Sequence, residues 1–238
     1  RLAREEKALW AKTETPEDLA RQEKVLSEKI RRIARAPEAR KRMEPGTEFV
    51  IVSGLPRSGM SLMMQMLAAG GLAVMTDGIR RADDFHSGEN FEWPRILKLP
   101  EDPYVIEEAY GRVVKVPSML LPHLPREHRY KVIFMDRPIE EVAASQERML
   151  KNNPAATDAR TAGQMRPALE QHRRHILKLL KDDGRFDVLI LSYPKLVMEP
   201  GNLVERIRDF LGADLVLSAM ASAIRPEWYR IRRGRTAK

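Results

Sequence analysis

Short apolar runs recur along the chain from residue 49 onward, at residues 49–53, 72–76, 112–116, 131–136 and 186–193. Each run is apolar nearly throughout, whereas a strand with one solvent-facing side alternates apolar and polar residues. Helical patterns lie between most of the runs, which is typical of βαβ units and of a parallel sheet buried on both faces. The pattern therefore predicts an α/β fold: a three-layer α/β/α domain around a central parallel sheet of about five strands.

The first part of the chain follows a different pattern. Thr15 and Pro16 are typical of a helix start, because threonine caps free backbone N–H groups and proline suits the first turn. The charged, amphipathic segment after them predicts a long helix. We therefore expect an N-terminal charged helical arm over residues 1–45 and an α/β domain over residues 46–238. The arm could pack on the domain, join two copies of the chain into a homo-oligomer, or link the domain to a region upstream.

The net charge of +8 lies in the two ends of the chain, because basic residues outnumber acidic ones in residues 1–44 and 225–238 but not between them. A solvated helix and a solvated tail would explain this excess, and so would an anionic substrate, a membrane surface or nucleic acid. Among these partners we do not expect nucleic acid.

Composition excludes several other classes of protein. No apolar run approaches the length of roughly 18 residues that a membrane-spanning helix needs. The chain has no cysteine, so it forms neither a disulfide framework nor a thiolate metal site. We see no spacing of histidine and carboxylate residues that indicates a metal site, and we expect none. The lack of cysteine fits a reducing compartment, and we expect a cytoplasmic location.

A glycine-containing loop, GLPRSGMS at Gly54–Ser61, connects the first predicted strand to a helical run. Its glycines permit tight turns, so successive backbone N–H groups at the helix start can surround an anion, and Ser58 can donate a hydroxyl hydrogen bond to it. The spacing is that of the nucleotide-binding loop G-x-x-x-x-G-K-[ST], but Met60 replaces the lysine. Arg57 supplies positive charge instead. The loop therefore predicts an anion site in a P-loop-type domain.

A second candidate site follows the fourth apolar run. The sequence KVIFMDRPIEEVAAS predicts a buried strand that ends at Asp136 and a helix that begins soon after it. Arg137 follows the strand directly, and Ser145 lies about two helical turns further along, on the side of the helix start. Both side chains could therefore bind one anionic group at the carboxyl edge of the sheet. Taken alone, the pair would also be explained by a surface arginine and an ordinary helix serine.

Together, these segments resemble the P-loop sulfotransferases, and the small bacterial members in particular. That family uses 3′-phosphoadenosine-5′-phosphosulfate (PAPS) and releases adenosine 3′,5′-bisphosphate (PAP). Its PKSGTT- or PRSGTS-type loop binds the 5′-phosphosulfate, and an arginine and a serine eight residues apart bind the 3′-phosphate. Gly54–Ser61 matches the loop, and Arg137 and Ser145 match the pair. The cofactor-binding residues that the resemblance implies are Pro56, Arg57, Ser58, Gly59, Met60, Ser61, Arg137, Ser145 and Tyr193.

Further segments extend the resemblance over residues 49–212. GRVVKVPSMLLPHLP carries Lys115 where the family has a lysine that contacts the transferring sulfuryl group, and LSYPKLVMEPGNLVERIRDFLG carries Tyr193 where the family has a residue near the adenine. The cytosolic branch of the family has its histidine base two residues after that lysine, but Pro117 stands there. The tail, WYRIRRG, is only loosely similar to the family's basic segment at the 3′-phosphate, and a solvated tail explains Arg230 and its basic neighbours equally well.

The base must then come from another segment. DDFHSGENFEWPRIL resembles the G-x-x-x-E segment that small bacterial members place over the active site, which implies Glu92 as general base, with His86 and Asp84 behind it. A helix-start acid would explain Glu92 as well. Arg57 and Lys115 suit the stabilisation of the transferring group and the leaving oxygen. The acceptor that we expect is a hydroxyl on a small molecule, a lipid or a carbohydrate.

Two alternative functions remain at this point. KVIFMD also resembles the strand of a P-loop kinase that ends in a magnesium-binding aspartate, but Met60 removes the lysine that phosphoryl transfer needs. A catalytically degenerate module that binds PAP without turnover is the other alternative. Pro117 leaves it open, but the presence of Arg57, Lys115, Arg137 and Ser145 together argues against it. Two histidines, His172 and His175, lie in a charged helix, and we expect both to be solvated.

Overall fold

A computed structural model describes residues 42–77, 91–151, 161–225 and 229 of the chain. Most of the predicted arm over residues 1–45 lies outside these residues, so the division at residue 46 stays a prediction. The alternative bases His86 and Asp84, and Arg230 with the basic residues after it, also lie outside the described residues. No helix in the described part is long and apolar enough to cross a membrane.

Four parallel strands form the sheet, in the order β2-β1-β3-β4. They are β1 (Glu48–Gly54), β2 (Val114–Pro117), β3 (Arg129–Asp136) and β4 (Phe186–Ser192). Each corresponds to a predicted apolar run. The remaining run, residues 72–76, lies beside the start of β2 but makes only an isolated bridge, between Val74 and Val113. Its pairing is too short for a strand, so the described sheet has one strand fewer than the approximate number predicted.

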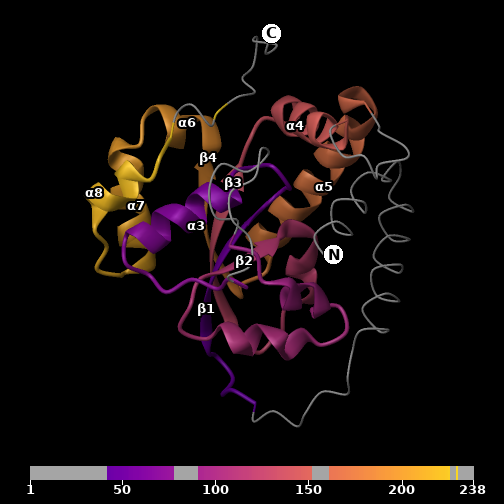
Figure 1. Cartoon of the computed structure of the whole chain (residues 1–238). Helices are drawn as coiled ribbons and strands as arrows, with labels where there is room; N and C mark the ends of the chain where they lie inside the picture. Colours follow the sequence, from indigo (N-terminus) through magenta and orange to yellow (C-terminus); the bar gives the residue numbers. More distant parts are fainter. Residues whose placement is uncertain (1–41, 78–90, 152–160, 226–228, 230–238) are drawn as a thin grey trace.

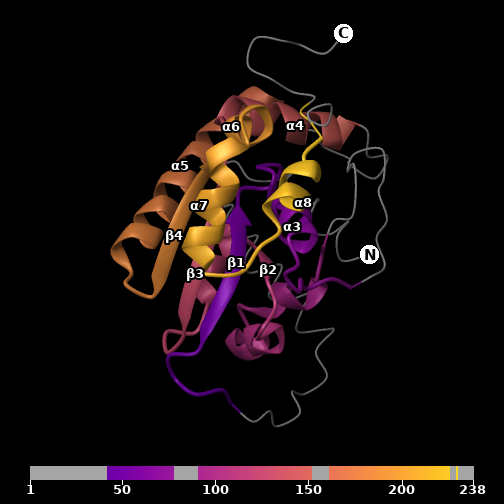
Figure 2. The ribbon, with the colours of Figure 1, turned by 90° about the vertical axis from the view of Figure 1, so that its left-hand side faces the viewer.

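Helices cover both faces of the sheet, as Figures 1 and 2 show. One face carries α4 (Ile139–Lys151), α5 (Ala162–Asp182) and the short 3-10 helices η1 (Pro94–Lys98), η2 (Pro103–Ala109) and η3 (Ser118–His123). The other carries α3 (Met60–Ala69), α6 (Tyr193–Met198), α7 (Gly201–Leu211) and α8 (Leu217–Ser222). Successive strand residues point to opposite faces, so Ile51 packs in the first core and Val52 in the second. The predicted three-layer α/β/α fold is confirmed.

The carboxyl ends of the strands meet at one edge of the sheet, toward the top of Figure 1. Gly54 at the end of β1 lies opposite Pro117 on one side and Met135 on the other, and Asp136 lies opposite Ser192. The chain passes from β1 to β2 on one side and then to β3 on the other. In open parallel sheets, ligands bind in the crevice outside such a point of reversal. The loop after β1 and the segment after β3 both open onto it.

Candidate functional site

The loop between β1 and α3 has a fixed shape that only glycine allows at two positions. Gly54 has φ 153°, and a Cβ atom there would lie 2.4 Å from the Ser58 hydroxyl oxygen and 2.6 Å from the Met135 carbonyl oxygen. Gly59, which caps α3, has φ 104°, and its Cβ atom would lie 2.2 Å from the ring of Tyr193. A side chain at either glycine would push the loop away from the sheet edge. The loop therefore keeps its backbone close to the N-terminus of α3.

Ser58 carries a polar group that the loop itself does not satisfy. Its side chain is 1% exposed, and its hydroxyl has no hydrogen-bond partner among the described residues. A buried hydroxyl in this state costs roughly 1–3 kcal/mol, so such groups usually have a ligand or water as partner. Met60, by contrast, is buried in the core between the sheet and α3. The residue that replaces the kinase lysine therefore packs as an ordinary apolar side chain.

Hydrogen bonds join the loop to the second candidate site. The Nε of Arg57 donates to the Ser145 hydroxyl at 3.1 Å, and the Nη1 of Arg137 donates to the Arg57 carbonyl at 3.0 Å. Arg57 has φ 71°, a backbone conformation that is uncommon outside glycine. The predicted pair, Arg137 and Ser145, is itself buried. Two cationic side chains and a serine hydroxyl, from the loop after β1 and the segment after β3, are thus brought together at the crevice.

Two residues of this cluster are absent from the sequence interpretation. The Nε of Arg137 donates to Glu141 at 3.0 Å, and the hydroxyl of Tyr229 donates to the other oxygen of Glu141 at 2.8 Å. The Arg137 guanidinium carbon lies 4.7 Å from the ring centroid of Tyr193. Glu141 is four residues after Arg137, a helical spacing that could have indicated the contact. Nothing in the sequence around Tyr229 indicates its partner.

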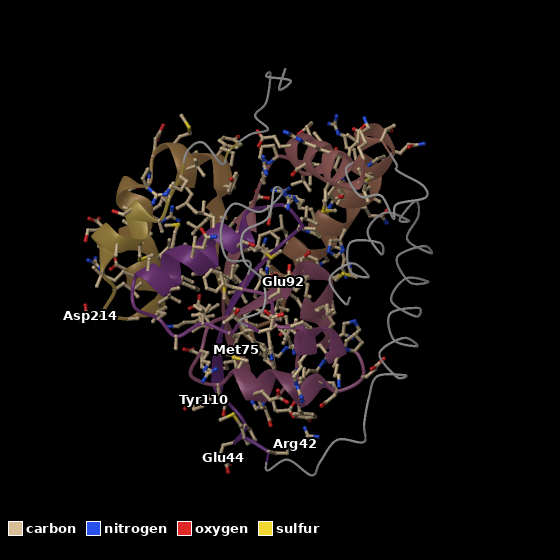
Figure 3. The ribbon with its side chains drawn as sticks, in the orientation of Figure 1. Arg42, Glu44, Met75, Glu92, Tyr110 and Asp214 are labelled. Carbon is tan, nitrogen blue, oxygen red and sulfur yellow. The ribbon has the colours of Figure 1, made fainter. Side chains whose placement is uncertain are left out.

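Lys115 and Glu92 lie together at the end of β2. The Lys115 ammonium and a Glu92 carboxylate oxygen are 3.9 Å apart, and both side chains are largely buried, with 12% and 18% of their surface exposed. Val114 and Val116 pack in the α4–α5 core, so Lys115 between them points to the α3 side of the sheet, where the loop helix lies. Figure 3 shows Glu92 in the middle of the molecule. A cation and a carboxylate are therefore available on the loop's side of the sheet.

Asp136, the metal ligand of the kinase interpretation, has a different partner. The guanidinium of Arg173 donates to both Asp136 carboxylate oxygens, at 2.7 and 2.6 Å. Hydrogen bonding to Asp136 raises the pKa of Arg173, which stays charged. A fork of this kind occupies the oxygens that magnesium would need. Among the described residues, no group of three or more histidine and carboxylate side chains could hold a metal ion.

His172 is half-buried and contacts a buried hydroxyl, whereas the sequence interpretation expected it to be solvated. Its Nε2 lies 2.9 Å from the hydroxyl of Ser118, a fully buried residue at the start of η3. Burial, with a smaller contribution from the charge of His175, lowers the pKa of His172 to about 4. The neutral imidazole therefore joins α5 to η3. The charged residues next to His172 in the sequence suggest an exposed helix, so the sequence pattern alone does not indicate this contact.

The depressed pKa of His172 predicts a stability that depends on pH. The unfolded chain takes up a proton near pH 6.5 and the folded chain only near pH 4, so the free energy of unfolding falls as pH drops through this window. We expect a loss of about 2 kcal/mol between pH 7 and pH 4.5. Urea unfolding at both pH values should show that His172→Gln removes most of this loss, whereas His175→Gln, an exposed position on the same helix, retains it. An equal loss in all three proteins would contradict the assignment.

The other cofactor-binding residues that the resemblance implies lie in the loop or next to it. Pro56 and Ser61 are half-buried on either side of the Ser58–Gly59 turn, and Tyr193 begins α6 directly behind Gly59. Pro117 ends β2, so the usual position of the histidine base is at the same edge but has no titratable group. The roles of all these residues stay predictions.

Comparison with known proteins places this geometry in a family. A model of the sulfotransferase domain matches residues 47–227. Among curated proteins, no sequence matches the chain. The sulfotransferase domain of an olefin synthase from Synechococcus PCC 7002 is 19% identical, with 85% of this chain and 94% of that chain covered and a TM-score of 0.48. A mouse sulfotransferase complexed with PAP is 15% identical, with 76% and 63% covered and a TM-score of 0.49.

A sulfotransferase from Mycobacterium tuberculosis H37Rv is likewise similar, with 15% identity, 87% of this chain and 77% of that chain covered and a TM-score of 0.48. The family model carries the assignment, because it spans well over half of the chain and includes the loop after β1, Lys115 on β2 and the Arg137–Ser145 segment after β3. The chain therefore belongs to the sulfotransferase domain family.

Proposed function

We propose that the chain transfers a sulfuryl group from PAPS to a hydroxyl of an acceptor and releases PAP. The observation that carries the proposal is the pair of hydrogen bonds from Arg57 to Ser145 and from Arg137 to the Arg57 carbonyl. They unite the loop and the second motif in one cationic cluster at the crevice. A nucleotide with phosphate groups at both the 5′ and the 3′ position would need such a joint site.

The residues present fit a ligand of this kind. The backbone of Gly54 and Gly59 leaves no room for side chains, the Ser58 hydroxyl is buried with no partner among the described residues, and the N-terminus of α3 favours an anion. These groups would hold the 5′-phosphosulfate. Arg137 and Ser145 would hold the 3′-phosphate. Tyr193 would lie near the adenine, as the sequence resemblance implies.

Three residues of the chain, Lys115, Arg57 and Glu92, would take part in the transfer itself. PAPS, when bound, supplies an activated sulfuryl group on a phosphate leaving group. Lys115 and Arg57 would balance the negative charge on the sulfuryl oxygens and on the leaving oxygen. Glu92, within 3.9 Å of Lys115, would take the proton of the attacking hydroxyl, because Pro117 cannot. The acceptor would be a small molecule, a lipid or a carbohydrate. Residues 46–238 would form the transferase domain, and residues 1–45 could join two copies.

Calorimetric titration of the purified chain with PAP, and in parallel with magnesium-ATP, tests the donor assignment. We expect PAP to bind with a Kd of about 1–10 μM, or roughly −7 to −8 kcal/mol, and magnesium-ATP to show no binding. Met60 removes the lysine that bridges the terminal phosphates, and Arg173 holds the only aspartate that the kinase interpretation offered. Tight binding of magnesium-ATP would instead favour a kinase. Binding of PAP without turnover of PAPS would favour the degenerate module.

A further inference from the structure

Tyr229 lies buried beside Arg137 and Tyr193, in the proposed nucleotide site. Its side chain is 7% exposed, and its hydroxyl donates at 2.8 Å to a Glu141 oxygen that belongs to a residue only 3% exposed. Its ring meets the ring of Tyr193 edge-on, with 5.3 Å between centroids and 87° between planes. Burial, then the hydrogen bond to Glu141, raises the pKa of Tyr229 to about 12, so the hydroxyl remains a donor at ordinary pH. The contact crosses 88 residues of sequence.

Glu141 is the link between this anchor and Arg137. One carboxylate oxygen accepts from Tyr229 and the other from the Nε of Arg137 at 3.0 Å. The Nη1 of Arg137 donates to the carbonyl of Arg57. Contacts at two nitrogens fix the plane of the guanidinium group, which also lies 4.7 and 5.4 Å from the ring centroids of Tyr193 and Tyr229. A guanidinium group whose orientation is already fixed before an anion binds loses less side-chain entropy on binding.

We propose that Tyr229 is a positioning residue that acts through Glu141 to orient Arg137, and that it thereby sets the preference of the site for nucleotides with a 3′-phosphate. The inference rests on the proposed function, because Arg137 is the group assigned to that phosphate. Removing the Tyr229 hydroxyl withdraws a donor from a buried carboxylate. The negative charge of Glu141 then attracts Arg137 more strongly, and the guanidinium group of Arg137 turns away from the 3′-phosphate. The 5′-phosphate site in the loop keeps its own donors.

The test compares the Kd of PAP with the Kd of adenosine 5′-phosphate by calorimetry. Tyr229→Phe keeps the ring and removes only the hydroxyl, and it should weaken PAP binding by about tenfold while the Kd of adenosine 5′-phosphate changes by less than about twofold. Tyr110→Phe is the matched control, because Tyr110 is 58% exposed and lies at the lower end of the molecule in Figure 3. It should change neither Kd.

A double-mutant cycle with Glu141→Gln separates positioning from general stability. Because Tyr229 is proposed to act through Glu141, the double variant should lose no more 3′-phosphate preference than Glu141→Gln alone. If the losses of 3′-phosphate preference in the two single variants add in the double variant, Tyr229 does not act through Glu141. If the native chain prefers PAP and Tyr229→Phe keeps the same preference for PAP over adenosine 5′-phosphate, the inference about Tyr229 is wrong and the proposed function stands. A native chain with no preference for PAP would overturn the proposed function and the inference together.

Discussion

Arg137→Ala should weaken PAP binding by about 100-fold and adenosine 5′-phosphate binding by less than about threefold. Removing one partner of a desolvated, hydrogen-bonded charge pair typically costs about 2–5 kcal/mol, and Arg137, at 8% exposed, is desolvated before any ligand binds. The loss falls on PAP because only PAP carries the 3′-phosphate. Calorimetric titration of both nucleotides into the native chain and the variant measures the two ratios directly.

The alanine variant also leaves the buried carboxylate of Glu141 without its arginine, which can destabilise the fold on its own. The double variant Arg137→Ala/Glu141→Gln removes this charge as well and should show the same selective loss. Arg129→Ala is the control, because Arg129 is an exposed arginine at the opposite end of β3. Equal losses of affinity for PAP and adenosine 5′-phosphate in a folded variant would show that Arg137 does not bind the 3′-phosphate.

The fold and the position of the loop could be predicted because they depend on local patterns. Strands that are buried on both faces are apolar at nearly every residue, and a strand, a glycine turn and a helix in succession give the loop a known place at the sheet edge. The run at residues 72–76 has the same pattern but forms only the bridge from Val74 to Val113. Apolar composition shows that a segment is buried and says little about how much of its backbone pairs.

The contacts within the site could not be predicted in the same way, because they join segments that are distant in the sequence. The pair of Tyr229 and Glu141, like that of Arg173 and Asp136, depends on how distant segments of the chain pack against one another. No local spacing encodes such a partner. These contacts alter the chemical interpretation nonetheless: Arg173 occupies the aspartate that a kinase would use for magnesium. The sequence identifies the charged groups of the site, and their partners come only from the tertiary structure.

The choice of base can be settled by Glu92→Gln, which should lower kcat by about 10²- to 10³-fold and leave the Kd of PAP within about twofold. A positioned base typically contributes a factor of this size, because the attacking hydroxyl must otherwise keep its proton as the new bond forms. Glutamine keeps the shape of the side chain and an oxygen near Lys115, so nucleotide binding should be retained. The rate is measured as PAP released from PAPS with a hydroxyl acceptor that the native chain turns over.

Glu108→Gln provides the matched control for the base assignment, because Glu108 is also paired with a cation, Arg95, but is more exposed than Glu92. Its kcat should equal that of the native chain. A fall in kcat together with a large rise in the Kd of PAP would mean that Glu92 holds Lys115 in place rather than accepting a proton. An unchanged kcat would assign the proton to His86 or Asp84, two other titratable residues of the same segment. Lys115 would then act beside a base from outside the described residues.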